Sequence, residues 1–315
     1  MRAIKFFMLV ALFVSSVNGW AQDDSQAVDR IQYASREVLP DPTVGPCPND
    51  QRTLTQVKGG LYRHTTGRGA AVHSGLVLIT SEGAIVIDPA STCTAGGLLD
   101  EIKSRFHVPV KYLILTHAHF DHMAGSQVFQ QAGATVIAQK NALEPIIGER
   151  QPSAVPDRVF EKQMTLTLGG ETVVLHHVGP SHSDSLALVY FPNYKALQCT
   201  DVCGSHTMLF NDLPDFYYDG FVETLDWVIK QDVDVIDPGH GALATKADQQ
   251  PHRNYVVNLH AQVLALLRQG DAWDQLYRKV TFTDEEKKWA GYDQMHILNI
   301  VGMHRWVTDH RRGVW

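Results

Sequence analysis

The sequence has no excess of basic residues, no repeats and no hydrophobic run long enough to span a membrane. Its 315 residues include 27 Lys and Arg against 34 Asp and Glu, which gives a formal net charge of -7 at pH 7. Proteins that bind DNA or RNA usually present a basic face to the phosphate backbone, so a nucleic-acid partner is not expected. The 24 Gly and 14 Pro are ordinary for a globular chain, which excludes collagen-like and disordered proteins.

The longest apolar segment lies at the N-terminus. Arg2 and Lys5 precede a nine-residue apolar run over 6–14, and small or polar residues follow as far as Ala21. A permanent membrane anchor needs about 20 apolar residues, so this run is too short. The pattern is typical of a secretory signal peptide over 1–21. It predicts a periplasmic or secreted protein that has no stable membrane anchor after cleavage near Ala21.

Cysteine is also scarce, with only Cys47, Cys93, Cys199 and Cys203 present. In an exported protein these residues can form up to two disulfides with three connectivities, and the sequence does not choose among them. Cys199 and Cys203 lack the partners of a structural zinc site, so metal or redox roles for them are disfavoured.

The order of predicted strands and helices indicates an α/β domain with a segment on either side. Residues 22–58 are polar with four clustered prolines, and we expect an irregular N-terminal arm. Residues 59–245 contain two successive runs of strands followed by helices, which favours two sheets between outer helices. Residues 246–315 have apolar residues at helical spacing. We expect this helical extension to pack on the domain, shape the pocket wall or mediate a homodimer.

Histidine is the residue present in unusual number, with 16 copies, and three of them occur in one short segment. A predicted strand over 110–115 precedes the run His117-Ala118-His119-Phe120-Asp121-His122. Side chains alternate along an extended segment, so His117 and His119 point to the same side and can bind one cation. Asp121 and His122 follow the turn, where they can face a second cation, as in two-metal hydrolases.

Two cations need more ligands than these four residues supply. Three other predicted strands are each followed by a residue that can bind metal, and these residues are His182, Asp201 and His240. Imidazole and carboxylate ligands without a thiolate suit Zn²⁺, with Fe and Mn as lesser alternatives. Two cations that share a water lower its pKa toward neutrality, so the expected reaction is hydrolysis.

The sequence contains, in this order, H-x-H-x-D-H, a lone His, a lone Asp and Pro-Gly-His-Gly. This ordered set resembles the metallo-β-lactamase fold superfamily over residues 60–245. The resemblance implies an αββα four-layer sandwich that carries a dinuclear site with two Zn²⁺ per chain. The residues that match the ligands of the first metal are His117, His119 and His182. Those that match the ligands of the second metal are Asp121, His122 and His240, and Asp201 matches the carboxylate that bridges both. Asp121, which can orient the hydroxide, and Asp201 are therefore the candidate catalytic residues.

The resemblance implies an exported zinc-dependent hydrolase that cleaves a small lactam, lactone, ester or thioester with a metal-bridging hydroxide. An Asp at position 201 makes the chain resemble the glyoxalase-II-like and lactonase-like hydrolases more than the classical β-lactamases. Ser181, however, precedes His182 where glyoxalase II and many lactonases have glycine. β-Lactam hydrolysis is therefore one candidate among several. Two alternatives stay open, which are an iron-dependent persulfide dioxygenase-like enzyme and a non-catalytic metal-binding accessory protein.

Other residues have two interpretations each. Asp88 ends a predicted strand and is either a partner of a ligand imidazole or a turn residue before Pro89. His73 lies either at the rim of the site or on the surface. The loop over 202–219, rich in aromatic residues, either contacts substrate or anchors itself on the core. Seven further histidines are expected to be structural or solvated, namely His176, His177, His252, His260, His296, His304 and His310.

Overall fold

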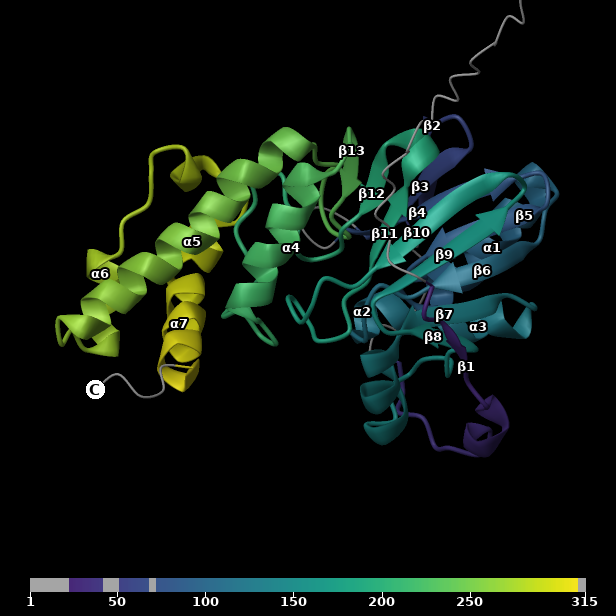
Figure 1. Ribbon diagram of the computed structural model, residues 1–315, viewed down its shortest axis with the longest axis horizontal. Helices are drawn as coiled ribbons and strands as arrows, with labels where there is room; N and C mark the ends of the chain where they lie inside the picture. Colours follow the sequence, from purple (N-terminus) through teal and green to yellow (C-terminus); the bar gives the residue numbers. More distant parts are fainter. Residues whose placement is uncertain (1–22, 42–50, 68–71, 311–315) are drawn as a thin grey trace, which may run out of the picture.

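The computed structural model describes residues 23–41, 51–67 and 72–310. The predicted signal peptide and Cys47 lie outside these residues. Two sheets lie face to face, and a group of helices extends from one end of the molecule (Figure 1). The predicted mixed α/β fold with C-terminal helices is therefore confirmed.

The first sheet has, within the described residues, eight strands in the order β1-β8-β7-β6-β5-β4-β3-β2. The strands are β1 (Gln26–Ala27), β2 (Thr53–Lys58), β3 (Leu61–Thr66), β4 (His73–Thr80), β5 (Gly83–Ile87), β6 (Val110–Ile114), β7 (Thr135–Gln139) and β8 (Arg158–Phe160). β2 to β5 are antiparallel, whereas β5 to β8 run parallel. Parallel strands end at the same edge of a sheet, so the residues after β5 and β6 lie side by side.

The second sheet has five described strands in the order β13-β12-β11-β10-β9. The strands are β9 (Gln163–Leu168), β10 (Glu171–His176), β11 (Leu188–Phe191), β12 (Ala196–Gln198) and β13 (Val235–Asp237). β12 and β13 are parallel, so the loops that follow them leave the sheet together. The backbone N–H of Asp201 donates to the carbonyl of Pro238 over 3.0 Å, which ties the two loops to each other.

Helices cover the outer face of each sheet. The described helices are α1 (Thr92–Phe106), α2 (Phe120–Met123), α3 (Ser126–Gln131), α4 (Tyr218–Lys230), α5 (Lys246–Arg268), α6 (Leu276–Lys279) and α7 (Tyr292–His310), of which α5 to α7 form the group that extends beyond α4. Short helical turns are η1 (Arg30–Tyr33), η3 (Lys140–Ala142), η4 (Glu144–Gly148), η5 (Pro192–Tyr194), η6 (Trp273–Gln275) and η7 (Glu286–Lys288). The buried apolar side chains form three clusters, one between the sheets and one under the helices on each side. Three apolar layers of this kind define an αββα sandwich.

The prediction of an irregular arm over 22–58 is wrong for its last six residues. β2 pairs with β3 along its length and buries Leu54 in the cluster beneath α1. Polar side chains alternate around Leu54, which is the pattern of a strand with one face exposed. The short strand β1 also pairs with β8, so the described part of the arm is attached to both edges of the first sheet.

Cys199 and Cys203 form a disulfide with a Cα–Cα distance of 5.5 Å. Cys93 is also disulfide-bonded. No cysteine in the described part of the chain has a free thiol. The expectation that these cysteines do not bind metal agrees with this bonding. Among the same residues, no helix has the length and hydrophobicity needed to cross a membrane.

The C-terminal helices pack on α4 and hold the loop over 202–217 (Figure 1). The Asn299 side chain on α7 donates to the carbonyls of Leu209 and Asn211 over 3.0 and 2.7 Å. Arg305 on the same helix binds the carboxylate of Asp212 over 2.7 Å. This part of the extension therefore fixes the path of the loop.

His252 on α5 is a buried histidine in this helical layer. Its ring packs against Gly204, and neither ring nitrogen makes a hydrogen bond of normal length. Burial lowers the pKa of His252 from 6.5 to about 4, and the nearby Val202 backbone offsets this only in part. The ring is therefore neutral in the folded protein at neutral pH.

We expect the stability of the protein to fall as the pH decreases from about 6.5 to about 4. In that range the unfolded chain binds a proton at His252 and the folded chain does not, which corresponds to about 3 kcal/mol. His252→Phe should lose correspondingly less stability over this range than the wild type. Urea unfolding of both metal-free proteins at a series of pH values measures the difference. The same pH dependence in both would contradict the assignment.

Candidate metal centre

Four residues form the first cluster of potential metal ligands, which are His117, His119, His182 and Asp201. One ligand atom from each lies within 4.8 Å of the others. His182 Nε2 is 3.0 Å from His119 Nδ1 and 3.4 Å from Asp201 Oδ2. His117 Nε2 is 3.5 Å from the same carboxylate oxygen. Three imidazoles and one carboxylate thus surround one point.

The second cluster consists of His73, Asp121, His122 and His240, and its ligand atoms also lie within 4.8 Å of one another. His122 Nε2 and His240 Nε2 are 3.0 Å apart. Asp121 Oδ2 lies 3.6 Å from His122 Nε2, 3.5 Å from His240 Nε2 and 3.7 Å from His73 Nδ1. This arrangement again directs nitrogen and oxygen donors toward a common point.

Asp201 joins the two clusters. Its Oδ2 is 3.1 Å from His122 Nε2 of the second cluster, in addition to its contacts with the first. Its Oδ1 is 3.3 Å from His240 Nε2. The backbone of Asp201 has a left-handed conformation with φ 61°, which turns the chain sharply after β12 and directs the carboxylate between the clusters.

The donor atoms fit a pair of divalent cations. Ligand atoms that share one tetrahedral zinc ion lie roughly 3.3 Å apart, as follows from zinc–ligand bonds of about 2.0 Å. The separations of 3.0 to 3.7 Å in both clusters have this size. His117 Nε2 is buried without a hydrogen bond, and a cation would supply its missing partner. The residues present therefore fit a dinuclear centre of nitrogen and oxygen ligands.

The electrostatics of the clusters favour cation binding. Burial lowers the pKa of His117 well below its usual value, with the neighbouring imidazoles adding to the effect, and it lowers that of His182 to about 4. Both imidazoles are therefore neutral at pH 7, the form that binds metal. Burial alone would raise the pKa of Asp201, but the charges of His122, His182 and His240 hold it well below the usual range.

Asp88 resolves one of the open interpretations. It follows β5, is almost fully buried, and places Oδ2 3.2 Å from His122 Nδ1. The same carboxylate accepts hydrogen bonds from the backbone N–H and the hydroxyl of Thr116 over 2.8 and 2.6 Å. Asp88 thus connects the ends of β5 and β6 and orients the ring of His122, a candidate ligand.

A second carboxylate, Asp215, contacts His119 from the loop over 202–217. Its Oδ2 lies 3.2 Å from His119 Nε2, and its side chain is largely exposed. In the same loop Met208 and Phe216 are buried against the C-terminal helices, whereas Phe210 and Tyr217 are exposed. The loop is therefore anchored on the core by some of its side chains and exposes two of its aromatic rings to solvent.

All seven residues proposed as ligands from the sequence lie in this centre. The sequence favoured neither the rim nor the surface for His73, and the structure places it in the second cluster. The strand that His73 begins reads His-Ser-Gly-Leu-Val-Leu-Ile-Thr and does not alternate polar and apolar residues, so no local pattern indicated an inward side chain. The other histidines lie elsewhere, as His176 stacks on Trp227 and His177 Nδ1 is 2.7 Å from the carbonyl of Leu186.

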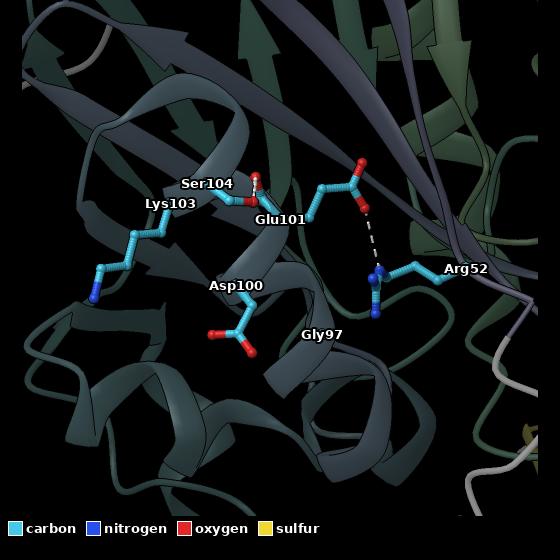
Figure 2. A pocket seen from close by; sticks show the side chains of 6 residues that line it. All are labelled: Arg52, Gly97, Asp100, Glu101, Lys103 and Ser104. Carbon is cyan, nitrogen blue, oxygen red and sulfur yellow. Dashed lines mark hydrogen bonds and ion pairs between the residues drawn. The ribbon is translucent and has the colours of Figure 1, made fainter.

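A separate hollow lies on the surface at α1, lined by Arg52, Gly97, Asp100, Glu101, Lys103 and Ser104. Figure 2 shows the Arg52 side chain facing Glu101, with 3.4 Å between Nε and Oε2. None of its lining residues belongs to the metal clusters, and its side chains carry both charges. This hollow has no apparent part in the chemistry of the centre.

Known proteins with similar sequences belong to one superfamily. Residues 67–240 match the Metallo-beta-lactamase superfamily, and the chain belongs to that superfamily. It is 25% identical over 203 residues to metallo-beta-lactamase type 2 of Bacillus cereus, covering 62% of this chain and 78% of that protein. It is also 25% identical over 204 residues to 2,4-dinitroanisole O-demethylase subunit alpha of Nocardioides sp. (strain JS1661), covering 62% of this chain and 61% of that protein.

A similar fold occurs in solved structures. The metallo-beta-lactamase from Pontibacter korlensis has a TM-score of 0.61 and 22% sequence identity, over 66% of this chain and 100% of that one. The metallo-beta-lactamase IND-7 has a TM-score of 0.58 and 22% identity, over 65% and 98% of the two chains. The resemblance to this superfamily that the sequence motifs indicated is confirmed.

We expect Asp88→Asn to weaken zinc binding by about 10–100-fold, because carboxylates that orient ligand imidazoles contribute on this scale. Competition with a chromophoric chelator measures the affinity, and circular dichroism of the metal-free variant verifies the fold. Asp219→Asn, at an exposed position on α4, is the matched control. Equal zinc affinity in Asp88→Asn and the wild type would show that Asp88 acts only as a turn residue.

Proposed function

We propose that the protein is an exported zinc-dependent hydrolase with two Zn²⁺ per chain that cleaves a small lactam, lactone, ester or thioester. The observation that carries the proposal is the carboxylate of Asp201 placed between the imidazoles of two clusters. Metal-dependent hydrolysis is the chemistry that membership of the superfamily and this ligand set support. The identity of the metal and of the substrate belongs to the proposal.

The residues of the two clusters would have different roles in such a reaction. His117, His119 and His182 would hold one zinc ion, and Asp121, His122 and His240 the other, with Asp201 between them. When bound, two zinc ions would lower the pKa of a shared water, polarise the substrate carbonyl and stabilise the developing negative charge. Asp121 is the carboxylate that is more open to solvent than Asp201, so it is placed to accept a hydrogen bond from the nucleophile and orient it.

Two exposed aromatic residues beside the candidate ligands favour a small substrate with an apolar part. Phe120 directly follows His119 in sequence and is 45% exposed. Tyr217 is 37% exposed, and its backbone N–H donates to the carbonyl of Ser181 over 2.7 Å, beside His182. The two aromatic residues thus flank the loops that carry the ligands. The named activities of relatives include a β-lactamase and an O-demethylase, so family membership alone does not select the substrate.

Export is supported by the sequence pattern over 1–21 and by the Cys199–Cys203 disulfide, because disulfides persist in oxidising compartments. We propose that cleavage leaves a mature chain that begins at Gln22. Mass spectrometry of protein exported by a bacterial host tests this, and a chain that retains residues 1–21 would contradict it.

We expect the mature protein to contain about two zinc ions per chain and to hydrolyse at least one of nitrocefin, a simple lactone and a thioester. His119→Ala should reduce kcat/KM by at least about 100-fold, because a ligand of the reacting centre is removed. His304→Ala, at a partly exposed position on α7 outside both clusters, is the control and should retain activity.

Two other outcomes would move the assignment to the alternatives. One iron per chain with oxidation of a persulfide and no hydrolysis would support the dioxygenase-like enzyme. Two zinc ions with no turnover on any of the three substrate classes would support the accessory protein.

A further inference from the structure

His73 is the member of the second cluster that the superfamily resemblance does not supply. It begins β4, and its backbone forms an isolated antiparallel bridge with His240. The N–H of Ser74 donates to the carbonyl of Gly239 over 2.7 Å, and His240 Nδ1 lies 3.2 Å from the carbonyl of Val72. The start of β4 and the loop after β13 are therefore fixed to each other by their backbones.

This pairing places the two rings against each other at the centre. The ring centroids of His73 and His240 are 4.6 Å apart, and that of His122 is 5.9 Å from His73. His73 Nδ1 is buried and makes no hydrogen bond. Its nearest charged neighbour is Asp121 Oδ2 at 3.7 Å, beyond hydrogen-bond distance. A buried ring nitrogen without a partner is unfavourable, and a cation among these four residues would satisfy it.

We propose that His73 Nδ1 is an additional protein ligand of the second metal ion. The inference rests on the dinuclear centre of the proposed function and adds to its ligand set. The second ion would then have three imidazoles, from His73, His122 and His240, together with the carboxylates of Asp121 and Asp201. The first ion would have three imidazoles and only the shared carboxylate.

This difference in donors has a chemical consequence. Five protein donors exceed the four of a tetrahedral zinc site and suit a cation that accepts five ligands. The additional nitrogen increases the affinity of the second position and leaves fewer of its coordination sites open to substrate. The protein should therefore retain its second ion at low free zinc concentration, because His73 holds it together with the ligands common to the superfamily.

The test compares the wild type with His73→Ala and His73→Gln, and uses His206→Ala as the control. His206 is exposed and lies outside both clusters. Zinc per chain after dialysis and the dissociation constant of each ion, from competition with a chromophoric chelator, are the first measurements. The absorption spectrum of the Co²⁺-substituted proteins is the second, since its intensity reports coordination number without any turnover.

We expect both His73 variants to keep the first ion and to bind the second at least roughly tenfold more weakly. Retention of the first ion shows that a variant is folded. The Co²⁺ spectrum of the second position should also change, while His206→Ala should match the wild type in every measurement.

Two results would overturn the inference. If the His73 variants bind both ions as the wild type does, with or without a change in KM, His73 does not ligate the metal and at most contacts substrate. If the wild type binds only one ion, there is no second metal for it to hold. A wild type that binds two ions but hydrolyses nothing would refute the proposed function alone, and the comparison of metal affinities would still decide the role of His73.

Discussion

The metal centre depends on the carboxylate of Asp201, which the fold holds between two groups of imidazoles. Its oxygens lie 3.1 to 3.5 Å from ring nitrogens of His117, His122, His182 and His240. Burial opposes its ionisation, but His122, His182 and His240 keep its pKa well below the usual range, so it remains negative. An ionised carboxylate at this point would favour a cation in either cluster. Removal of that charge would leave the two clusters as separate, weaker sites.

The arrangement of the two sheets brings these residues together. Asp88 and His117 follow the adjacent parallel strands β5 and β6, and Asp201 and His240 follow the adjacent parallel strands β12 and β13. Because parallel strands end at a common edge, each sheet delivers a pair of polar loops to one place. The apolar cluster between the sheets then holds the two edges in contact. The geometry of the centre is thus a result of sheet packing, and no ligand depends on a long flexible loop alone.

The sequence predicts those parts of the centre that follow from local patterns. Alternation along an extended segment identifies His117 and His119. The ends of three predicted strands identify His182, Asp201 and His240. The role of His73 could not be predicted in this way, because it depends on pairing between segments that are 168 positions apart, as between Val72 and His240. The strand β2 was missed because clustered prolines precede it and only one of its residues, Leu54, is buried.

The two positions of the centre are supported by different parts of the molecule. His122 is oriented by the buried Asp88, which is fixed between the ends of two central strands. His119 is contacted by the exposed Asp215, which lies on a loop that Arg305 and other residues of the C-terminal helices hold in place. The helical extension supplies none of the described ligands, yet it determines where that loop runs. A change at the interface of α7 with the loop would therefore act on the first cluster through His119 and on the exposed Tyr217. It would leave the second cluster intact.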